Sequence, residues 1–182
     1  DDFVSRGGHK LAGALDTFSD IKVEGKRCLD AGASTGGFTD VLLRRGADCV
    51  VAADVGYGQL AWEIQQNPKV VILDRTNIRH LTGELVGDPI DLVVADLSFI
   101  SLTLVLPALA AVSKPEADYV LMVKPQFEVG RERLGAGGVV RDPALRKAAV
   151  IEVAGSAYDV GLGTLKVTAS PLPGPAGNVE YF

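Results

Sequence analysis

Short apolar runs alternate with amphipathic segments along most of the chain. Each run has few polar interruptions, which is typical of strands that are buried on both faces of a parallel sheet. We expect strands at 27–31, 49–54, 70–73, 91–95 and 119–123. Between and after these runs, apolar residues recur at helical spacing. We expect helices over 6–18, 37–45, about 60–64, 76–85, 102–112 and 143–158.

This order of elements predicts an α/β fold. Parallel strands need crossover connections, which are usually helical, so the alternation indicates a Rossmann-like, mostly parallel sheet. The pattern changes at residues 126–141, which hold four glycines and several charges without a period. Loops of this length are often functional lids. Residues 165–169 and 179–182 are expected to pair as a C-terminal antiparallel hairpin across the Pro/Gly-rich segment 171–177.

Composition excludes several classes of protein. A length of 182 residues suits one domain, and 47% hydrophobic with 23% charged residues does not indicate disorder. The longest apolar stretch, Leu102–Val112, contains Pro107 and is far shorter than the roughly 20 residues that cross a bilayer. We therefore expect no secretory leader, no stable membrane insertion and a cytoplasmic location.

Net charge and cysteines narrow the possibilities further. The net charge of −5 argues against a protein that grips nucleic acid by bulk electrostatics, so a polyanionic partner would need local basic patches or a separate module. We interpret Cys28 and Cys49, both in expected strands, as core thiols rather than a disulfide or a ligand pair. Cysteine and histidine residues show no metal-ligand spacing, so no metal site is expected.

The most informative stretch is the turn after the first expected strand. It runs from Asp30 through Gly32, Gly36 and Gly37 into a helix. In a parallel sheet this position is the carboxyl end of a strand, where ligands collect. Glycines there let a ligand approach the backbone, although tight strand-to-helix packing would also require them. The spacing departs from the G-x-G-x-x-G fingerprint of dinucleotide sites.

Acidic residues at the strand ends restrict the ligand. Asp54 follows Gly32 by 22 residues, where a carboxylate can accept hydrogen bonds from the ribose of NAD or of S-adenosylmethionine alike. Asp30 favours the latter, because a carboxylate there suits a cation and repels a pyrophosphate. Asp74 and Asn77 are candidates to contact an adenine edge, and a solvated strand end explains each equally well. The cofactor candidates are Asp30, Gly32, Ser34, Gly36, Gly37, Phe38, Asp54, Asp74 and Asn77.

Two charged residues end the fourth and fifth expected strands. Asp96 and Lys124 should share the sheet edge that carries the glycine turn. Apolar neighbours surround them in Asp96-Leu-Ser-Phe and Lys124-Pro-Gln-Phe, and a lysine beside apolar surface and a carboxylate can act as a base. Pro125 holds Lys124 in extended geometry. Solvated strand-end charges are the alternative interpretation.

Several motifs together resemble one family. They are the run Asp30-Ala-Gly-Ala-Ser-Thr-Gly-Gly-Phe-Thr, Asp96-Leu-Ser-Phe, Val123-Lys-Pro-Gln-Phe-Glu, Gly137-Gly-Val-Val-Arg-Asp and Asn178-Val-Glu. In this order they resemble the TlyA/hemolysin A family of ribosomal RNA 2′-O-methyltransferases, within the wider FtsJ-like methyltransferases. Many FtsJ-like relatives have proline at the position of Thr35. Threonine at this position matches the TlyA branch. The resemblance covers nearly the whole chain.

The resemblance implies a fold, a cofactor, a substrate and a catalytic set. It implies the Rossmann-like class I methyltransferase fold over residues 1–182, S-adenosylmethionine as methyl donor, and ribosomal RNA within ribosomal subunits as substrate. The family's Lys-Asp-Lys-Glu tetrad falls on Lys10, Asp96, Lys124 and Glu180.

The resemblance also bears on RNA binding. Relatives carry an S4-type RNA-binding domain before the catalytic one, and we expect it to be absent from this chain. A local basic rim is expected from Arg6, His9, Lys10, Arg131, Arg133 and Arg141, although ordinary surface charges explain the loop arginines equally well.

Two other functions stay open at this point. The first alternative is a nucleotide-binding oxidoreductase, which could use a similar sheet. The second is a membrane-lytic function, which the family name hemolysin suggests. The sequence offers no strongly basic amphipathic helix for the second of these. The oligomeric state and the target nucleotide are not indicated by any motif.

Overall fold

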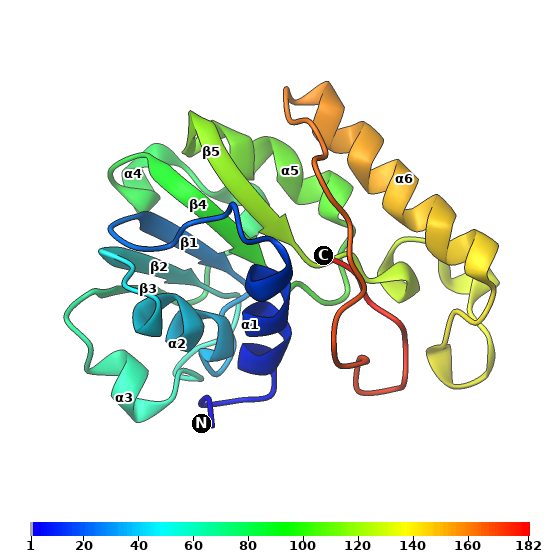
Figure 1. Cartoon of the computed structure of the whole chain (residues 1–182), viewed down its shortest axis with the longest axis horizontal. Coiled ribbons are helices and arrows are strands. Elements are labelled where there is room, and N and C mark those ends of the chain that lie inside the picture. The colour runs from blue at the N-terminus through cyan, green and yellow to red at the C-terminus, as the bar shows by residue number, and fades with distance from the viewer. Residues whose placement is uncertain (1) are drawn as a thin grey trace.

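Five parallel strands form the central sheet of the computed structural model, which describes residues 2–182 (Figure 1). Their order is β3-β2-β1-β4-β5. The bounds are Arg27–Ala31 (β1), Cys49–Ala53 (β2), Val70–Leu73 (β3), Ile90–Ala95 (β4) and Ser113–Leu121 (β5). Since the chain moves outward in one direction from β1 to β3 and in the other from β4 to β5, the crevice at the β1 and β4 ends is the switch point where ligands bind in such sheets.

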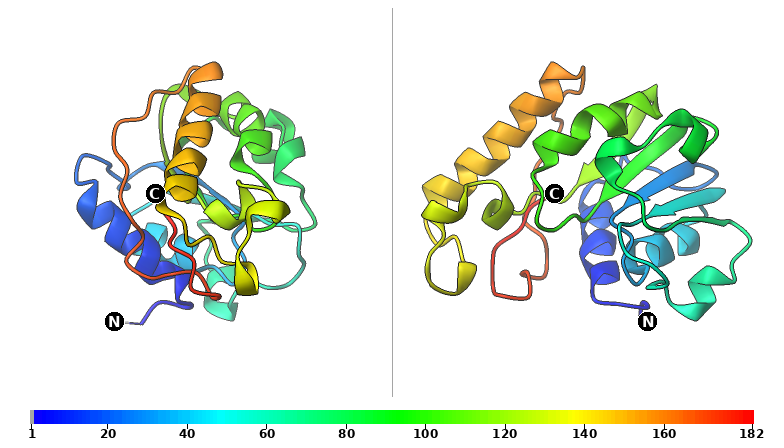
Figure 2. Two further views of the ribbon diagram at one scale, coloured as in Figure 1. Left: turned by 90° about the vertical axis from the view of Figure 1, so that its right-hand side faces the viewer. Right: turned by 180° about the vertical axis from the view of Figure 1, so that it is seen from behind.

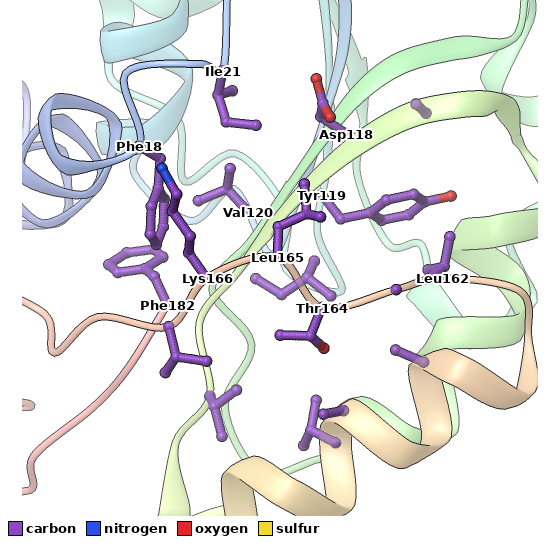
Figure 3. Close-up of a pocket in the computed structure, with 18 of the residues that line it drawn as sticks. Phe18, Ile21, Asp118, Tyr119, Val120, Leu162, Thr164, Leu165, Lys166 and Phe182 are labelled. Atoms are coloured by element: carbon purple, nitrogen blue, oxygen red, sulfur yellow. The ribbon is translucent and has the colours of Figure 1, made fainter.

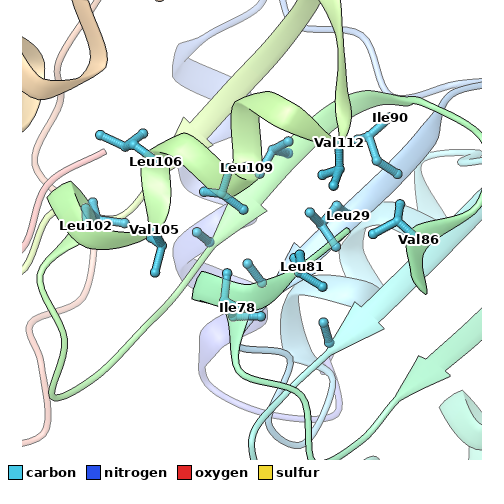
Figure 4. Close-up of a cluster of buried hydrophobic side chains, with 14 of the residues drawn as sticks. Leu29, Ile78, Leu81, Val86, Ile90, Leu102, Val105, Leu106, Leu109 and Val112 are labelled. Carbon is cyan, nitrogen blue, oxygen red and sulfur yellow. The ribbon is translucent and has the colours of Figure 1, made fainter. Parts of the chain in front are cut away.

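Helices cover both faces of this sheet (Figure 2). They are α1 (Gly7–Thr17), α2 (Gly37–Arg44), α3 (Trp62–Gln65), α4 (Gly83–Val86), α5 (Leu102–Ala111) and α6 (Pro143–Asp159). Side chains alternate between faces along each strand: Cys28 and Val50 pack with α1 and α2, whereas Leu29 and Val51 pack with α5 and α6. Figure 4 shows the second cluster, in which Leu29 meets the leucines and valines of α5.

Most predicted elements are confirmed, but the helix over 76–85 is wrong. Two short helices replace it, η1 (Ile78–His80) and α4. Asn77 accepts a hydrogen bond from the Arg79 N–H and Thr82 accepts one from Leu85 N–H, so each short helix has its own N-cap. Leu81 and Thr82 are extended between them, which interrupts the helix.

The predicted C-terminal hairpin is not confirmed as a pair of strands of the sheet. Residues 168–170 and 180–182 do run antiparallel, with backbone hydrogen bonds in both directions between Thr168 and Phe182 and one from Ser170 N–H to the Glu180 carbonyl, and bridges join Tyr181 to Ala169 and to Val123. The bridge to Val123 still matters, because it brings the C-terminal segment to the end of β5.

The long glycine-rich loop contains three single turns of 3₁₀ helix: η2 (Pro125–Phe127), η3 (Arg131–Arg133) and η4 (Ala136–Gly138). Its second half is tied to the C-terminal segment by Asn178, which accepts from Val140 N–H at 2.9 Å and donates to the Gly138 carbonyl at 3.1 Å. The loop is therefore anchored at its base.

Over residues 2–182, no helix has the length and apolar character that a membrane span requires. Cys28 and Cys49 are free thiols, as expected. The described residues also contain no cluster of potential metal ligands.

Candidate active site

The glycine turn between β1 and α2 is shaped by contacts within the protein. Gly32 and Gly36 have φ values of +83° and +99°, which L side chains rarely adopt. A Cβ on Gly32 would collide with the carbonyl oxygen of Asp96, and a Cβ on Gly37 would collide with Ser5 Oγ. These glycines let the turn pack against the end of β4 and the segment before α1, which supports the packing interpretation.

Asp54 fastens this turn to the end of β2. Its two carboxylate oxygens accept hydrogen bonds from the N–H groups of Ser34 and Gly56, each at 2.8 Å. A carboxylate oxygen has a second lone pair, so the predicted ribose contact stays possible and stays a prediction. Asp74 likewise accepts from Gly58 N–H at 3.2 Å, and the Asn77 side chain caps η1.

Asp30 is completely buried beneath the turn. Thr39 donates a hydrogen bond to its Oδ2 at 2.7 Å, while Oδ1 has no partner among the described residues. Burial raises the pKa of Asp30 from 3.8 to about 7; the hydrogen bond from Thr39 opposes this rise and Asp96 adds to it. The site therefore holds a carboxyl group that a nearby cation would ionise.

This raised pKa predicts a pH-dependent stability. Between about 4 and 7 the folded chain binds a proton at Asp30 that the unfolded chain has lost, so the free energy of unfolding should fall as pH rises through this range, by up to about 4 kcal/mol. Asp30→Asn should remove this part of the decline. Urea unfolding of both proteins at pH 5 and 8 measures it, and parallel pH profiles would contradict the assignment.

The four residues of the predicted tetrad form two ion pairs. Lys124 Nζ lies 2.5 Å from Asp96 Oδ1, without the alignment of a hydrogen bond, and donates to Ser98 Oγ at 3.0 Å. Lys10 Nζ lies 3.1 Å from Glu180 Oε1. Lys10, Lys124 and Glu180 are 7%, 8% and 1% exposed, and charges so deeply buried require partners. Within residues 2–182, no ion pair joins one pair to the other.

The fold gathers the tetrad from four distant segments. Lys10 lies on α1, Asp96 directly follows β4, and Lys124 lies between β5 and η2. Glu180 arrives through the bridge of its neighbour Tyr181 to Val123, with backbone hydrogen bonds of 2.7 and 3.0 Å.

A cavity of about 270 Å³ is lined by the glycine turn and by one residue of each ion pair, Lys10 and Asp96. Its lining includes six predicted site residues, Lys10, Gly32, Ser34, Gly37, Phe38 and Asp96. Phe38 also packs against Phe182, with 6.1 Å between ring centroids. The predicted residues outside its lining are Asp30, Gly36, Asp54, Asp74, Asn77, Lys124 and Glu180. Lys124 thus meets the cavity only through its partner Asp96.

A larger cavity, of about 390 Å³, lies elsewhere (Figure 3). It separates β5 from the extended segment after α6, and apolar residues such as Val120, Leu165 and Phe182 line much of it. No predicted site residue lines it. Of these two cavities, the smaller one alone is lined by charged candidate residues, Lys10 and Asp96.

Comparison with known proteins decides the family. The FtsJ-like methyltransferase family model matches residues 3–182. This chain belongs to that family. The 16S/23S rRNA (cytidine-2′-O)-methyltransferase TlyA of Mycobacterium tuberculosis is 63% identical over 180 residues, which cover 99% of this chain and 67% of that protein. The chain thus spans about two thirds of the length of this relative.

Solved structures agree with this membership. A Streptococcus thermophilus protein titled a hemolysin superposes on this FtsJ-like domain with a TM-score of 0.95 at 41% identity, covering all of this chain and 66% of the other. An S-adenosylmethionine-dependent methyltransferase of Mesorhizobium loti gives 0.62 at 16% identity, with coverages of 86% and 82%, and shows a shared fold alone. The predicted α/β methyltransferase fold is confirmed.

The structure adds residues that the sequence patterns did not single out. Ser98 accepts the hydrogen bond of Lys124, and Gln126 donates to Glu180 Oε2 at 2.8 Å. Each lies two positions after a tetrad residue, inside a motif already noted. A polar side chain so near a charged strand end was the only sign in the sequence that these residues belong to the site.

Phe99 is the third addition to this FtsJ-like site. It is 90% exposed, has φ +63°, and lies 4.9 Å from the Phe127 ring by centroids. An exposed aromatic side chain on a strained backbone three residues after Asp96 indicates a binding role. The sequence pattern could not predict the positive φ of Phe99, because hydrophobic periodicity carries no information about the backbone angle of a single loop residue.

Proposed function

We propose that this chain transfers a methyl group from S-adenosylmethionine to a ribose 2′-hydroxyl of ribosomal RNA. The observation that carries the proposal is that Lys10 pairs with Glu180 and Lys124 with Asp96, and that Lys10 and Asp96 line the same cavity as the glycine turn. The 63% identical relative, named for cytidine-2′-O methylation, supports the same reaction. Ribosomes lie in the cytoplasm of bacteria, which is where we place the activity.

The residues at the turn fit S-adenosylmethionine, which supplies a methyl group on a positively charged sulfur when bound. The buried Asp30 keeps one oxygen, Oδ1, without a hydrogen-bond donor among the described residues, which suits a cationic ligand nearby. We infer that the backbone of Gly32 to Gly37 holds the amino-acid end of the cofactor, with Asp30 and Asp54 on either side. Asp74, Asn77 and Phe38 complete the proposed cofactor set.

Lys124 is the residue proposed to handle the proton. Lys124 would take this proton as a neutral amine while the methyl–sulfur bond breaks and S-adenosylhomocysteine leaves, or, as the ammonium that pairs with Asp96, would stabilise the forming alkoxide. Asp96 and Ser98 hold Lys124 Nζ, and the centroid of the Phe127 ring lies 6.0 Å from it. Lys10, held by Glu180, places a positive charge on the cavity wall, where it stabilises a developing oxyanion. Orientation of the reacting oxygen contributes on the order of 7–11 kcal/mol in well-aligned systems.

The RNA side of the site is proposed to combine a basic rim with Phe99. Arg6 lines the cavity, and Arg131, Arg133 and Arg141 are exposed on or beside the anchored loop. His9 is exposed and adds to the rim, whereas Lys10 is 7% exposed and paired with Glu180, so it adds little charge to the surface. The net charge of −5 still leaves most of the surface unsuited to a polyanion, so a local rim is what the charges support.

Phe99→Ala should weaken RNA binding. Stacking of a base on an aromatic side chain contributes about 1–3 kcal/mol, so the KM for RNA should rise roughly 5- to 100-fold, with S-adenosylmethionine binding unchanged. The matched control is Tyr158→Ala, because Tyr158 is also an exposed aromatic, 77% accessible on α6. An unchanged KM in Phe99→Ala would remove Phe99 from the RNA surface.

Cofactor binding separates the proposal from its alternatives. Calorimetry should show binding of S-adenosylmethionine and S-adenosylhomocysteine and none of NAD. The opposite pattern would favour the oxidoreductase. Lysis of liposomes by a protein with Lys124 and Asp96 both replaced would favour the lytic function, for which the described residues offer no membrane-spanning helix.

A further inference from the structure

Gln126 occupies a special place between the two ion pairs. It lies two residues after Lys124, in the short helix η2, and its Nε2 donates a hydrogen bond to Glu180 Oε2 at 2.8 Å. The other oxygen of Glu180, Oε1, faces Lys10 Nζ at 3.1 Å. Gln126 therefore connects the segment that carries Lys124 to the carboxylate that holds Lys10, which no ion pair does in the described part of the chain.

The orientation of the Gln126 amide follows from chemistry. An ionised carboxylate only accepts hydrogen bonds, so the amide nitrogen must face Glu180 and the carbonyl oxygen must point elsewhere. That oxygen is buried and has no donor among the described residues. An unpaired buried acceptor is unfavourable for stability, and such groups in native proteins call for a functional reason.

The Glu180 carboxylate needs more than one partner to be held in place. It is 1% exposed, and the space around it is closed by Gly174, where a Cβ would lie 2.7 Å from Oε2. Lys10 alone could pair with either oxygen in several rotamers. The hydrogen bond from Gln126 to Oε2 restrains rotation of the carboxylate, while Oε1 pairs with Lys10, and this orients the Lys10 ammonium on the cavity wall.

We propose that Gln126 is a positioning residue for methyl transfer, which fixes the Glu180 carboxylate and, through it, the Lys10 ammonium. The inference rests on the proposed function. Gln126 acts through Glu180 and not on the cofactor, so its loss should slow the reaction without weakening S-adenosylmethionine binding.

A double-mutant cycle with Glu180 tests this role. Gln126→Met preserves the length of the side chain and removes its amide, and we expect kcat to fall about 10-fold with the Kd for S-adenosylmethionine unchanged. Because Gln126 acts through Glu180, adding Gln126→Met to Glu180→Ala should cause no further loss of kcat. Gln126→Ala repeats the cycle with a smaller side chain, should the first variant fold poorly.

Each outcome of the cycle bears on a separate claim. Full activity of Gln126→Met, or additive losses in the double variant, would overturn the positioning role while the methyl-transfer proposal stands. No transfer by the parent protein would overturn the proposed function and this inference with it. Gln66→Ala, at an exposed glutamine of the α3 end, is the control and should leave kcat unchanged.

Discussion

Lys124→Ala should reduce methyl transfer on the order of 10²- to 10⁴-fold, the range that a lost general base usually produces. The reason is that the 2′-hydroxyl would lose the nitrogen proposed to accept its proton or to stabilise its alkoxide. S-adenosylmethionine binding should persist, because Lys124 does not line the cavity with the glycine turn. Single-turnover transfer and calorimetry on the full-length protein measure the two quantities.

Lys114→Ala provides the matched control for that variant. Lys114 Nζ also pairs with a carboxylate, that of Asp91, at 2.7 Å. This pair lies at the amino ends of β4 and β5, and neither residue lines the cavity. Replacement of Lys114 should leave transfer unchanged. Transfer retained by Lys124→Ala at the parent rate would exclude Lys124 as the proton acceptor.

Gly32→Ala should be the most damaging single substitution for stability in the site. The new Cβ would collide with the Asp96 carbonyl, and φ would stay at +83°. The conformational penalty of about 1–2 kcal/mol and an overpacking penalty of about 1–3 kcal/mol together predict a loss of roughly 2–5 kcal/mol. S-adenosylmethionine binding should be lost as well, since the turn would move away from β4. Thermal unfolding and calorimetry measure both effects.

Gly25→Ala separates the two contributions. Gly25 has φ +74°, but a Cβ at this position would point into open space, with no neighbouring atom within 4 Å. This variant should show the conformational penalty alone. Equal destabilisation by Gly25→Ala and Gly32→Ala would mean that the close approach of the turn to Asp96 contributes nothing.

The sequence predicted the parallel sheet because its central strands, β1, β2 and β4, are buried on both faces. Runs such as 49–54 are apolar almost throughout, and this signal does not depend on distant residues. The helix over 76–85 failed for a local reason, since two N-caps, Asn77 and Thr82, compete with continuous helix. The C-terminal hairpin is not confirmed as strands of the sheet, because its antiparallel pairing extends over residues 168–170 and 180–182 alone.

The site was harder to derive from local patterns than the sheet. Strand ends placed Asp96 and Lys124 on one edge, but Lys10 and Glu180 are 170 positions apart and only the family resemblance related them. The structure brings them within 3.1 Å. Asp54 and the glycines also stabilise the turn itself. Their spacing in the sequence could not distinguish this structural role from ligand binding.

Transfer of a labelled methyl group to ribosomal RNA tests the central claim most directly. The full-length protein would be incubated with methyl-labelled S-adenosylmethionine and ribosomal subunits that lack the modification, and the RNA then hydrolysed with alkali. A 2′-O-methyl group blocks cleavage at its nucleotide, so the label should appear in alkali-resistant dinucleotides and should be absent with Lys124→Ala. Label on a base, or no label with subunits that a known 2′-O-methyltransferase can modify, would contradict the proposal.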